Sequence, residues 1–195
     1  MNGGESAKLA LRDQVVTTRN RRSLVERTEV ARALADRLLA DQEVRRAATV
    51  AAYVSIGSEP GTGLLLRDLA AAGKRVILPV LLPDGDLDWA RFDGDDSLAP
   101  ARLGLLEPVG PRLGPDAVAT ADVVLVPGLA VSATGDRLGR GGGSYDRALA
   151  RVPVGTFTCI LLHEDEVGLD VPVEPHDRRV TAAATPSGIT RFQHE

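Results

Sequence analysis

The sequence is poor in cysteine and contains no long apolar run. Its single cysteine, Cys159, excludes a disulfide within the chain, and a reducing compartment is its natural environment. No apolar run reaches the roughly 18 residues that a membrane-spanning helix needs. The N-terminal residues also lack the apolar region of a signal peptide. We therefore expect a cytoplasmic protein that has no membrane partner.

Aromatic residues are scarce as well. They make up 3% of the chain, too few for the stacking platforms on which single-stranded nucleic acids bind. The net charge of -4 also opposes general binding to a phosphate backbone, so we expect no nucleic-acid partner. The cations are nevertheless uneven, because residues 8–22 carry five against one acid and residues 137–151 carry four against one. These stretches indicate a local site for a polyanion, although two solvated arginine-rich faces would give the same counts.

The order of predicted elements favours an α/β fold. A helix over residues 6–20 with Ser6 as its N-cap precedes a clearer helix that Ser23 and Glu26 can open as a capping box. A third helix, over residues 62–73, can end at Gly73. Apolar or β-branched runs predict strands over residues 48–55, 75–80, 87–92, 122–128, 155–162 and 180–185.

Several of these runs are continuously apolar, as in strands covered on both faces. Apart from the strand at 87–92, segments 81–121 and 163–179 are rich in proline, glycine and aspartate and predict surface loops. We expect one domain over residues 1–195. Its fold class is α/β, a three-layer sandwich whose mostly parallel or mixed central sheet is flanked by helices on both faces.

Residues 122–151 combine a buried strand, a glycine-rich loop and a helix that starts near Ser144. Glycines let backbone N–H groups approach an anion, and a helix N-terminus adds partial positive charge. Arg137 and Arg140 add full charges that can pair with phosphate oxygens. The spacing matches neither the P-loop nor the dinucleotide-binding fingerprint. The pattern alone leaves open both a phosphate site and a long turn that uses glycine for positive φ angles.

The segment from Val126 to Asp146, VPGLAVSATGDRLGRGGGSYD, closely resembles the signature of the 5-formyltetrahydrofolate cyclo-ligase family, also called methenyltetrahydrofolate synthetases. The family pattern is V-P-G, a short linker, then G-x-R-L-G-x-G-x-G-x-Y-D. Further matches follow the family's order along the chain: Lys8 and Arg12 as K-x-x-x-R, SIGSEPGT at 55–62, GKRVILPV, LGLLEP and VPVEPHD.

The resemblance implies that the protein uses ATP as a cosubstrate and Mg²⁺ as a cofactor to convert 5-formyltetrahydrofolate to 5,10-methenyltetrahydrofolate, releasing ADP and phosphate. The γ-phosphoryl group would activate the formyl oxygen, N10 would close the ring, and phosphate would leave. Such chemistry needs positioning and charge neutralisation rather than a protein nucleophile. The implied partners are a reduced folate and ATP, and we expect a monomer.

The resemblance also implies which residues bind phosphate and metal. Lys8 and Arg12 lie four residues apart on one helix face and would hold the phosphate tail, unless that face is simply solvated. Arg140 would be the catalytic charge on the transferring group. Asp146 and Asp177 would bind Mg²⁺; otherwise one is a helix-terminal carboxylate and the other a loop acid. The residues expected to wrap the triphosphate are Arg137, Leu138, Gly139, Arg140, Gly141, Gly142, Gly143, Ser144 and Tyr145.

For the folate, the resemblance implies contacts with Val54, Glu59 and Tyr145. A carboxylate such as Glu59 suits the donor-bearing edges of a reduced folate, although an ordinary surface acid before a proline reads the same way. Trp89 fits either the pteridine pocket or the core. We interpret His176 as a loop residue rather than a ligand, since histidine suits magnesium poorly.

Three positions depart from the family pattern. Ser144 stands where most relatives carry an aromatic residue, and Val131 and Ser132 replace a Phe-Asp pair. The missing ring removes a surface that could pack against folate. This weakens the expectation of folate binding more than the expectation of ATP binding. Two alternatives therefore stay open: a weakly catalytic homologue that binds a folate or nucleotide, and a sugar-phosphate enzyme on a similar fold.

Overall fold

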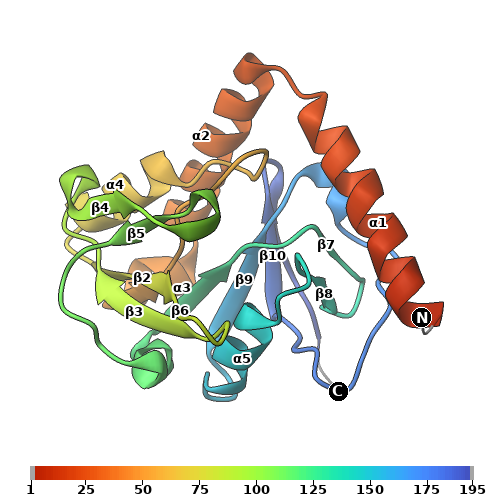
Figure 1. The fold of residues 1–195 in the computed structure, drawn as a ribbon. Helices are drawn as coiled ribbons and strands as arrows, with labels where there is room; N and C mark the ends of the chain where they lie inside the picture. The colour runs from red at the N-terminus through yellow and green to blue at the C-terminus, as the bar shows by residue number, and fades with distance from the viewer. Residues whose placement is uncertain (1–2, 194–195) are drawn as a thin grey trace.

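The computed structural model describes residues 3–193, and its centre is a seven-stranded sheet in the order β11-β10-β9-β6-β1-β2-β3 (Figure 1). The strands are β1 (Thr49–Ala51), β2 (Arg75–Leu81), β3 (Leu87–Arg91), β6 (Val123–Val126), β9 (Phe157–Leu161), β10 (Ala182–Thr185) and β11 (Gly188–Arg191). The five inner strands are parallel, and β3 and β11 pair antiparallel at the two edges. The expected α/β fold with a mixed central sheet is confirmed.

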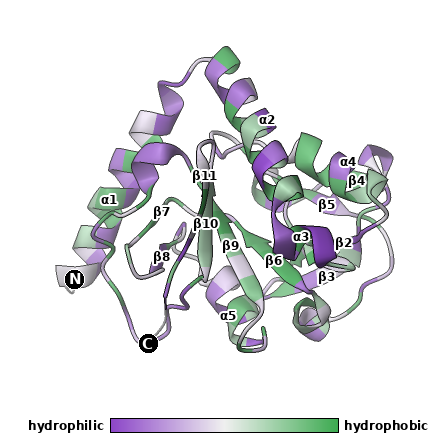
Figure 2. Cartoon of the chain, turned by 180° about the vertical axis from the view of Figure 1, so that it is seen from behind, coloured by the Kyte–Doolittle hydropathy of each residue, from purple (hydrophilic) through white to green (hydrophobic). Residues whose placement is uncertain are grey.

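Helices cover both faces of the sheet, which explains the continuous apolar strands. In β6, Val123 and Leu125 face the core shared with α2 and α4, whereas Val124 and Val126 face the core shared with α5. Each apolar residue therefore has a core on its own side, and Figure 2 shows hydrophobic colour concentrated on these inner strands. The covering helices are α2 (Leu24–Ala40), α3 (Gln42–Arg46), α4 (Gly63–Ala71), α5 (Ser144–Ala150) and the 3-10 helix Pro115–Thr120.

The N-terminal helix α1 (Gly3–Asn20) lies beside the hairpin formed by β7 (Ala130–Val131) and β8 (Arg137–Leu138) (Figure 1). Val15 packs there in a third apolar cluster with Leu129 and Leu138. The fully buried Arg19 donates to the Glu166 carboxylate at 2.8 Å and to the Gly128 carbonyl at 2.7 Å. A buried charge is costly unless it is paired in this way. The pair therefore fixes the end of α1 against the end of β6.

The helix boundaries agree with the sequence in two places and differ in one. Ser23 and Glu26 form the predicted capping box, with Ser23 N–H donating to Glu26 Oε2 at 2.6 Å and Glu26 N–H donating to Ser23 Oγ at 3.2 Å. Gly73 has φ +80° just after α4, as a helix stop requires. The prediction of Ser6 as an N-cap is wrong because α1 already begins at Gly3.

Some segments are more ordered, or shorter, than the sequence suggests. The segment 81–121 forms the hairpin of β4 (Leu98–Pro100) and β5 (Leu106–Pro108), together with the 3-10 helices Asp95–Ser97, Arg102–Gly104 and Pro115–Thr120. The loop 163–179 holds one 3-10 helix, Glu164–Glu166, and the strand predicted over 48–55 is only β1. Strands of two to four residues are too short to show a period. Within residues 3–193, no helix combines the length and apolar character needed to cross a membrane.

Candidate active site

A cavity of about 800 Å³ lies where the parallel strands β1, β2 and β6 reach their carboxyl ends. This edge of a parallel sheet is where α/β proteins usually bind ligands. All residues to which we assigned a role line this one cavity: Lys8, Arg12, Val54, Glu59, Arg137, Leu138, Gly139, Arg140, Gly141, Gly142, Gly143, Ser144, Tyr145, Asp146 and Asp177. The structure thus brings the candidates together, while their individual roles remain predictions.

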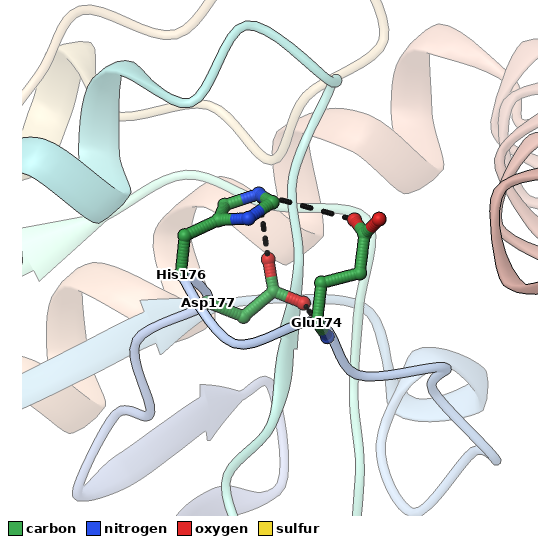
Figure 3. Close-up of side chains that lie close together, drawn as sticks. All are labelled: Glu174, His176 and Asp177. Atoms are coloured by element: carbon green, nitrogen blue, oxygen red, sulfur yellow. Dashed lines mark hydrogen bonds and ion pairs between the residues drawn. The ribbon is translucent and has the colours of Figure 1, made fainter.

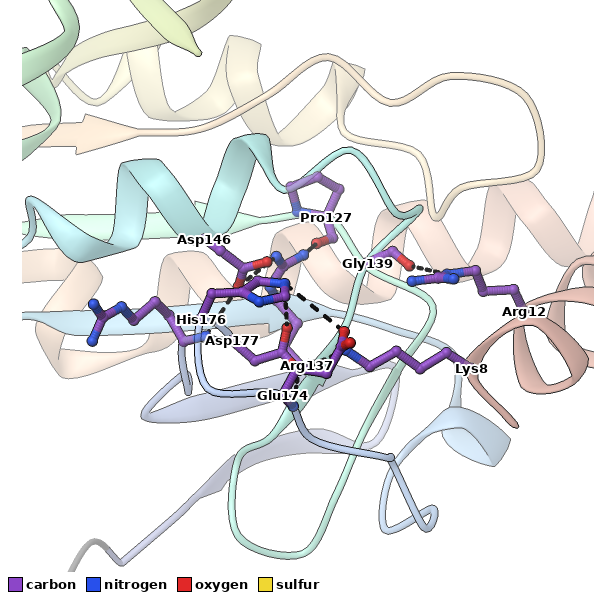
Figure 4. Close-up of polar contacts among 10 residues, drawn as sticks. Lys8, Arg12, Pro127, Arg137, Gly139, Asp146, Glu174, His176 and Asp177 are labelled. Carbon is purple, nitrogen blue, oxygen red and sulfur yellow. Dashed lines mark hydrogen bonds and ion pairs between the residues drawn. The ribbon is translucent and has the colours of Figure 1, made fainter. Parts of the chain in front are cut away.

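The glycine loop curls around the N-terminus of α5. Gly143 occupies the N-cap position with φ +70°, and Gly141 has φ +105°; both values lie in the region that favours glycine. The Arg12 Nε donates to the Gly139 carbonyl at 2.9 Å, so its guanidinium joins α1 to this loop (Figure 4). The side chain of Leu138 is buried in the cluster under α1. Leu138 can therefore meet a ligand mainly through its backbone.

Lys8 carries its charge into the cavity but is already paired there. Its Nζ lies 2.6 Å from Glu174 Oε2 and 2.7 Å from Asp177 Oδ2 (Figure 4). Burial lowers the pKa of Lys8, but the two carboxylates outweigh burial and raise it overall. The predicted helix face shared by Lys8 and Arg12 is present. In this structure Lys8 pairs with two of the protein's own carboxylates, whereas Arg12 donates to the glycine loop.

Asp177 belongs to a small group of possible metal ligands. Glu174, His176 and Asp177 each offer a ligand atom, and these atoms lie within 4.8 Å of one another (Figure 3). Burial raises the pKa of Asp177. Hydrogen bonds from Lys8 and from the Glu174 backbone N–H lower this pKa by more than burial raises it, so the net shift is downward. The His176 ring is 66% exposed on the loop, 3.6 Å from Asp177 Oδ1.

Asp146 is held at the start of α5, outside that group of three. Its Oδ1 accepts from the Arg137 guanidinium at 3.4 Å and from the Arg178 backbone N–H at 3.0 Å. Arg137 also donates to the Pro127 carbonyl at 3.1 Å and lies over the Tyr145 ring. Sequence reasoning assigned Arg137 to phosphate. In the structure this buried guanidinium orients Asp146 and fills the wall of the cavity.

Glu59 and Arg140 meet across the cavity. The Arg140 Nε lies 3.3 Å from Glu59 Oε1, and Glu59 Oε2 accepts from the Ile56 backbone N–H at 2.8 Å. Burial raises the pKa of the Glu59 carboxyl, and the Ile56 N–H and Arg140 offset part of that rise. Burial also raises the pKa of Tyr145, as does the nearby charge of Glu59. Tyr145 therefore keeps its proton at neutral pH and remains a hydrogen-bond donor.

The other half of the cavity wall is apolar, and sequence reasoning missed much of it. It includes Val54, Ile56, Pro79, Leu81, Leu87, Leu103, Leu105 and Leu106. The last three come from the β4–β5 hairpin, which we interpreted as a surface loop. Leu103 is 81% exposed and has φ +59°, an uncommon conformation for a leucine. The LGLLEP match at residues 103–108 is the sequence signal that could have identified this wall.

The positions that depart from the family pattern fall in different places. Val131 is fully buried in the core beside α5, and the Ser132 hydroxyl donates to Asp136 Oδ2 at 2.8 Å within its own turn. Neither lines the cavity. Ser144 does, and its hydroxyl donates to the Gly85 carbonyl at 2.6 Å. Trp89 is completely buried in the core rather than in the cavity wall.

Comparison with known proteins agrees with this arrangement. Residues 4–186 match the model of the 5-formyltetrahydrofolate cyclo-ligase family. The chain belongs to this family. A 5-formyltetrahydrofolate cyclo-ligase of Mycolicibacterium smegmatis is 42% identical over 143 residues, covering 71% of this chain and 73% of that protein. One of Escherichia coli K12 is 33% identical over 172 residues, covering 84% and 92%.

Solved structures of cyclo-ligase relatives share the fold. The structure of Aquifex aeolicus 5,10-methenyltetrahydrofolate synthetase superposes with a TM-score of 0.83 and 28% identity, covering 96% of this chain and 94% of that one. The synthetase of Mycoplasma pneumoniae superposes with a TM-score of 0.74 at 20% identity and supports the fold alone. The chain is thus a member of an enzyme family, and its cavity is the candidate active site.

Proposed function

We propose that this protein is an ATP- and Mg²⁺-dependent 5-formyltetrahydrofolate cyclo-ligase. The observation that carries the proposal is the convergence of all its candidate phosphate, metal and folate residues on one cavity of about 800 Å³. Part of the cavity wall consists of lysine and arginine side chains and the glycine loop, and part of it is apolar. A triphosphate fits the first kind of wall, and an aromatic ring system fits the second. The single buried cysteine supports action in the cytoplasm.

The chemistry required is the activation of an inert formamide. The γ-phosphoryl group of ATP passes to the formyl oxygen, breaking its bond to the β-phosphate bridge and leaving ADP. N10 then attacks the formyl carbon, its proton goes to water, and the phosphorylated oxygen leaves as phosphate. The glycine loop and Arg12 hold the phosphate tail, and Arg140 neutralises oxygen charge as the phosphoryl group moves. Tyr145 and Glu59 hold the folate through its donors and acceptors.

The metal proposed for this reaction is Mg²⁺, which prefers hard oxygen ligands and phosphates. Asp146 and Asp177 supply carboxylate oxygens on the cavity wall. Of the two Asp146 oxygens, Oδ1 accepts hydrogen bonds from other described residues, whereas Oδ2 accepts none from them. The Lys8 ammonium between Glu174 and Asp177 supports a cation site at this position. The carboxylate chemistry of these residues therefore fits the metal. When bound, Mg²⁺ neutralises charge on the β- and γ-phosphate oxygens.

The experiment is an absorbance assay of methenyltetrahydrofolate formation from 5-formyltetrahydrofolate, with and without ATP and Mg²⁺. We expect product only when all three are present. Tight ligand binding without product at any ATP concentration would favour the weakly catalytic binder, and ATP-independent isomerase activity would favour a sugar-phosphate enzyme. Asp146→Asn should strongly weaken the Mg²⁺-dependent activity. If that variant keeps the parent's dependence, Asp146 is not a ligand.

A further inference from the structure

Glu59 and Arg140 form an ion pair across the cavity. Glu59 comes from the loop after β1, and Arg140 comes from the glycine loop before α5. The Arg140 Nε lies 3.3 Å from Glu59 Oε1, and the side chains are 51% and 6% exposed, respectively. The one ion pair therefore combines a half-solvated cation with an almost fully buried anion.

This difference in burial makes the two partners unequal. Glu59 keeps one further hydrogen bond, from the Ile56 backbone N–H at 2.8 Å, and burial disfavours its charged form. A buried carboxylate that loses its cation is strongly destabilised. Arg140 is exposed enough for water to replace the carboxylate at little cost. The cost of separating the pair therefore falls mainly on Glu59.

We infer that this ion pair couples the two ligand subsites: Arg140 turns to the phosphate tail readily only after a donor group of the reduced folate has replaced it at Glu59. The inference rests on the proposed function, which assigns Arg140 to phosphate and Glu59 to folate. The two ligands then bind synergistically, and each raises the affinity for the other by the same factor. Glu59 is thus a positioning residue for Arg140 in addition to its contact with folate. ATP bound without folate lacks the Arg140 contact, which limits wasteful transfer of phosphate to water.

The test measures the binding of AMP-PNP with Mg²⁺ by calorimetry, alone and with saturating 5-formyltetrahydrofolate. In the wild-type protein, we expect folate to raise AMP-PNP affinity at least about fivefold. In Glu59→Gln, the amide no longer holds the guanidinium. AMP-PNP alone should therefore bind several times more tightly than to the wild type, and the enhancement by folate should disappear. A purely structural role for Glu59 would instead lower the melting temperature and leave AMP-PNP affinity unchanged or weaker.

The matched control is Asp95→Asn, which breaks the Arg67–Asp95 ion pair, also 3.3 Å long but outside the cavity. It should change neither AMP-PNP affinity nor its enhancement. If Glu59→Gln folds poorly, Arg140→Gln provides a second route: it should bind AMP-PNP alone about as tightly as the wild type does and show no enhancement by folate. Equal AMP-PNP affinity in the wild type and Glu59→Gln would overturn the coupling and leave the proposed function intact. Failure of the wild type to bind either ligand would overturn the proposed function itself.

Discussion

At the scale of single residues, several charged groups of the cavity are paired with one another. Lys8 is bound by Glu174 and Asp177, Arg140 by Glu59, and Arg137 by Asp146. Pairing lets the folded chain keep these charges close together at the sheet edge without strong repulsion. A charged ligand that binds here replaces ion pairs within the protein by ion pairs with the ligand. Its affinity therefore depends on the difference in free energy between these two sets of ion pairs.

Arg140→Ala tests the residue that we assign to the transferring phosphoryl group. We expect kcat to fall about a hundredfold or more, because a positioned cation stabilises charge that develops in the transition state. The side chain is half exposed, so the variant should stay folded by circular dichroism. Arg67→Ala, which removes an exposed arginine outside the cavity, is the control and should leave kcat unchanged. Unchanged turnover in Arg140→Ala would remove Arg140 from the phosphate site.

His163 should make stability depend on pH. It is 2% exposed, and burial, followed by the charges of Arg22 and Arg19, lowers its pKa to about 4. The unfolded chain binds this proton near pH 6.5, whereas the folded protein does not bind it until the pH approaches 4. The free energy of unfolding therefore falls as the pH drops through this window, by about 2 kcal/mol between about pH 7 and pH 5.

Urea unfolding at several pH values measures the effect of His163. His163→Leu should remove most of the pH dependence between pH 7 and pH 5. His176→Ala replaces a histidine whose ring is 66% exposed and should keep the slope of the wild type. The same slope in His163→Leu and the wild type would show that another group takes up the proton.

At the scale of elements, α1 carries two of the residues to which we assign phosphate binding. This helix contributes Lys8 and Arg12 to the cavity. It is held at its other end by the buried ion pair of Arg19 with Glu166, whose side chains are 0% and 3% exposed. The helix that we propose to bind phosphate is therefore anchored through Arg19 at its C-terminal end, beyond Lys8 and Arg12.

Glu166→Gln should destabilise the protein by about 3–5 kcal/mol, because it leaves Arg19 buried without its counter-charge. It should also weaken AMP-PNP binding, since a loosened α1 displaces Lys8 and Arg12. The free energy of unfolding in urea and the calorimetric affinity measure the two effects. The control is Asp165→Asn, which breaks the ion pair with Arg22; the Asp165 side chain is 54% exposed. This variant should lower the free energy of unfolding by at most about 1 kcal/mol. Equal effects of the two variants would contradict the anchoring role.

The β4–β5 hairpin provides part of the apolar cavity wall to which we assign the folate. Its Leu103 is highly exposed and lines the cavity, so Leu103→Ala removes little packing from the folded protein. We expect the KM for 5-formyltetrahydrofolate to rise about tenfold, because the binding free energy from burying part of the leucine side chain against the substrate is lost. The KM for ATP should stay constant. Val109→Ala, an exposed change just after β5 and outside the cavity lining, is the control. An unchanged folate KM would show that the hairpin does not touch the substrate.

At the scale of the whole molecule, the expectations of one domain and a monomer remain predictions. Sedimentation velocity should give one species near 20.6 kDa. Urea unfolding followed by fluorescence and by circular dichroism should give coincident single transitions, as a single domain of this size requires. A second species whose fraction grows with concentration would contradict the monomer, and separate transitions would contradict the single domain.

The sequence alone predicted the fold class, most of the sheet strands and most of the polar residues that line the cavity. These predictions succeeded because they depend on local order. Continuous apolar runs report strands with a core on each side, as in β6, and the motif from Val126 to Asp146 is contiguous. The sequence missed the β4–β5 hairpin, since strands of three residues are too short to show a pattern.

Only the tertiary structure decided which charges pair. Lys8 meets Asp177 across a separation of 169 residues, and Arg19 meets Glu166 across 147. No spacing in the sequence encodes such contacts, because they depend on how α1 docks against the sheet and on where the loops end. The local pattern thus determined which chemical groups the cavity contains. The docking of distant segments determined which of those groups hold one another until a ligand arrives.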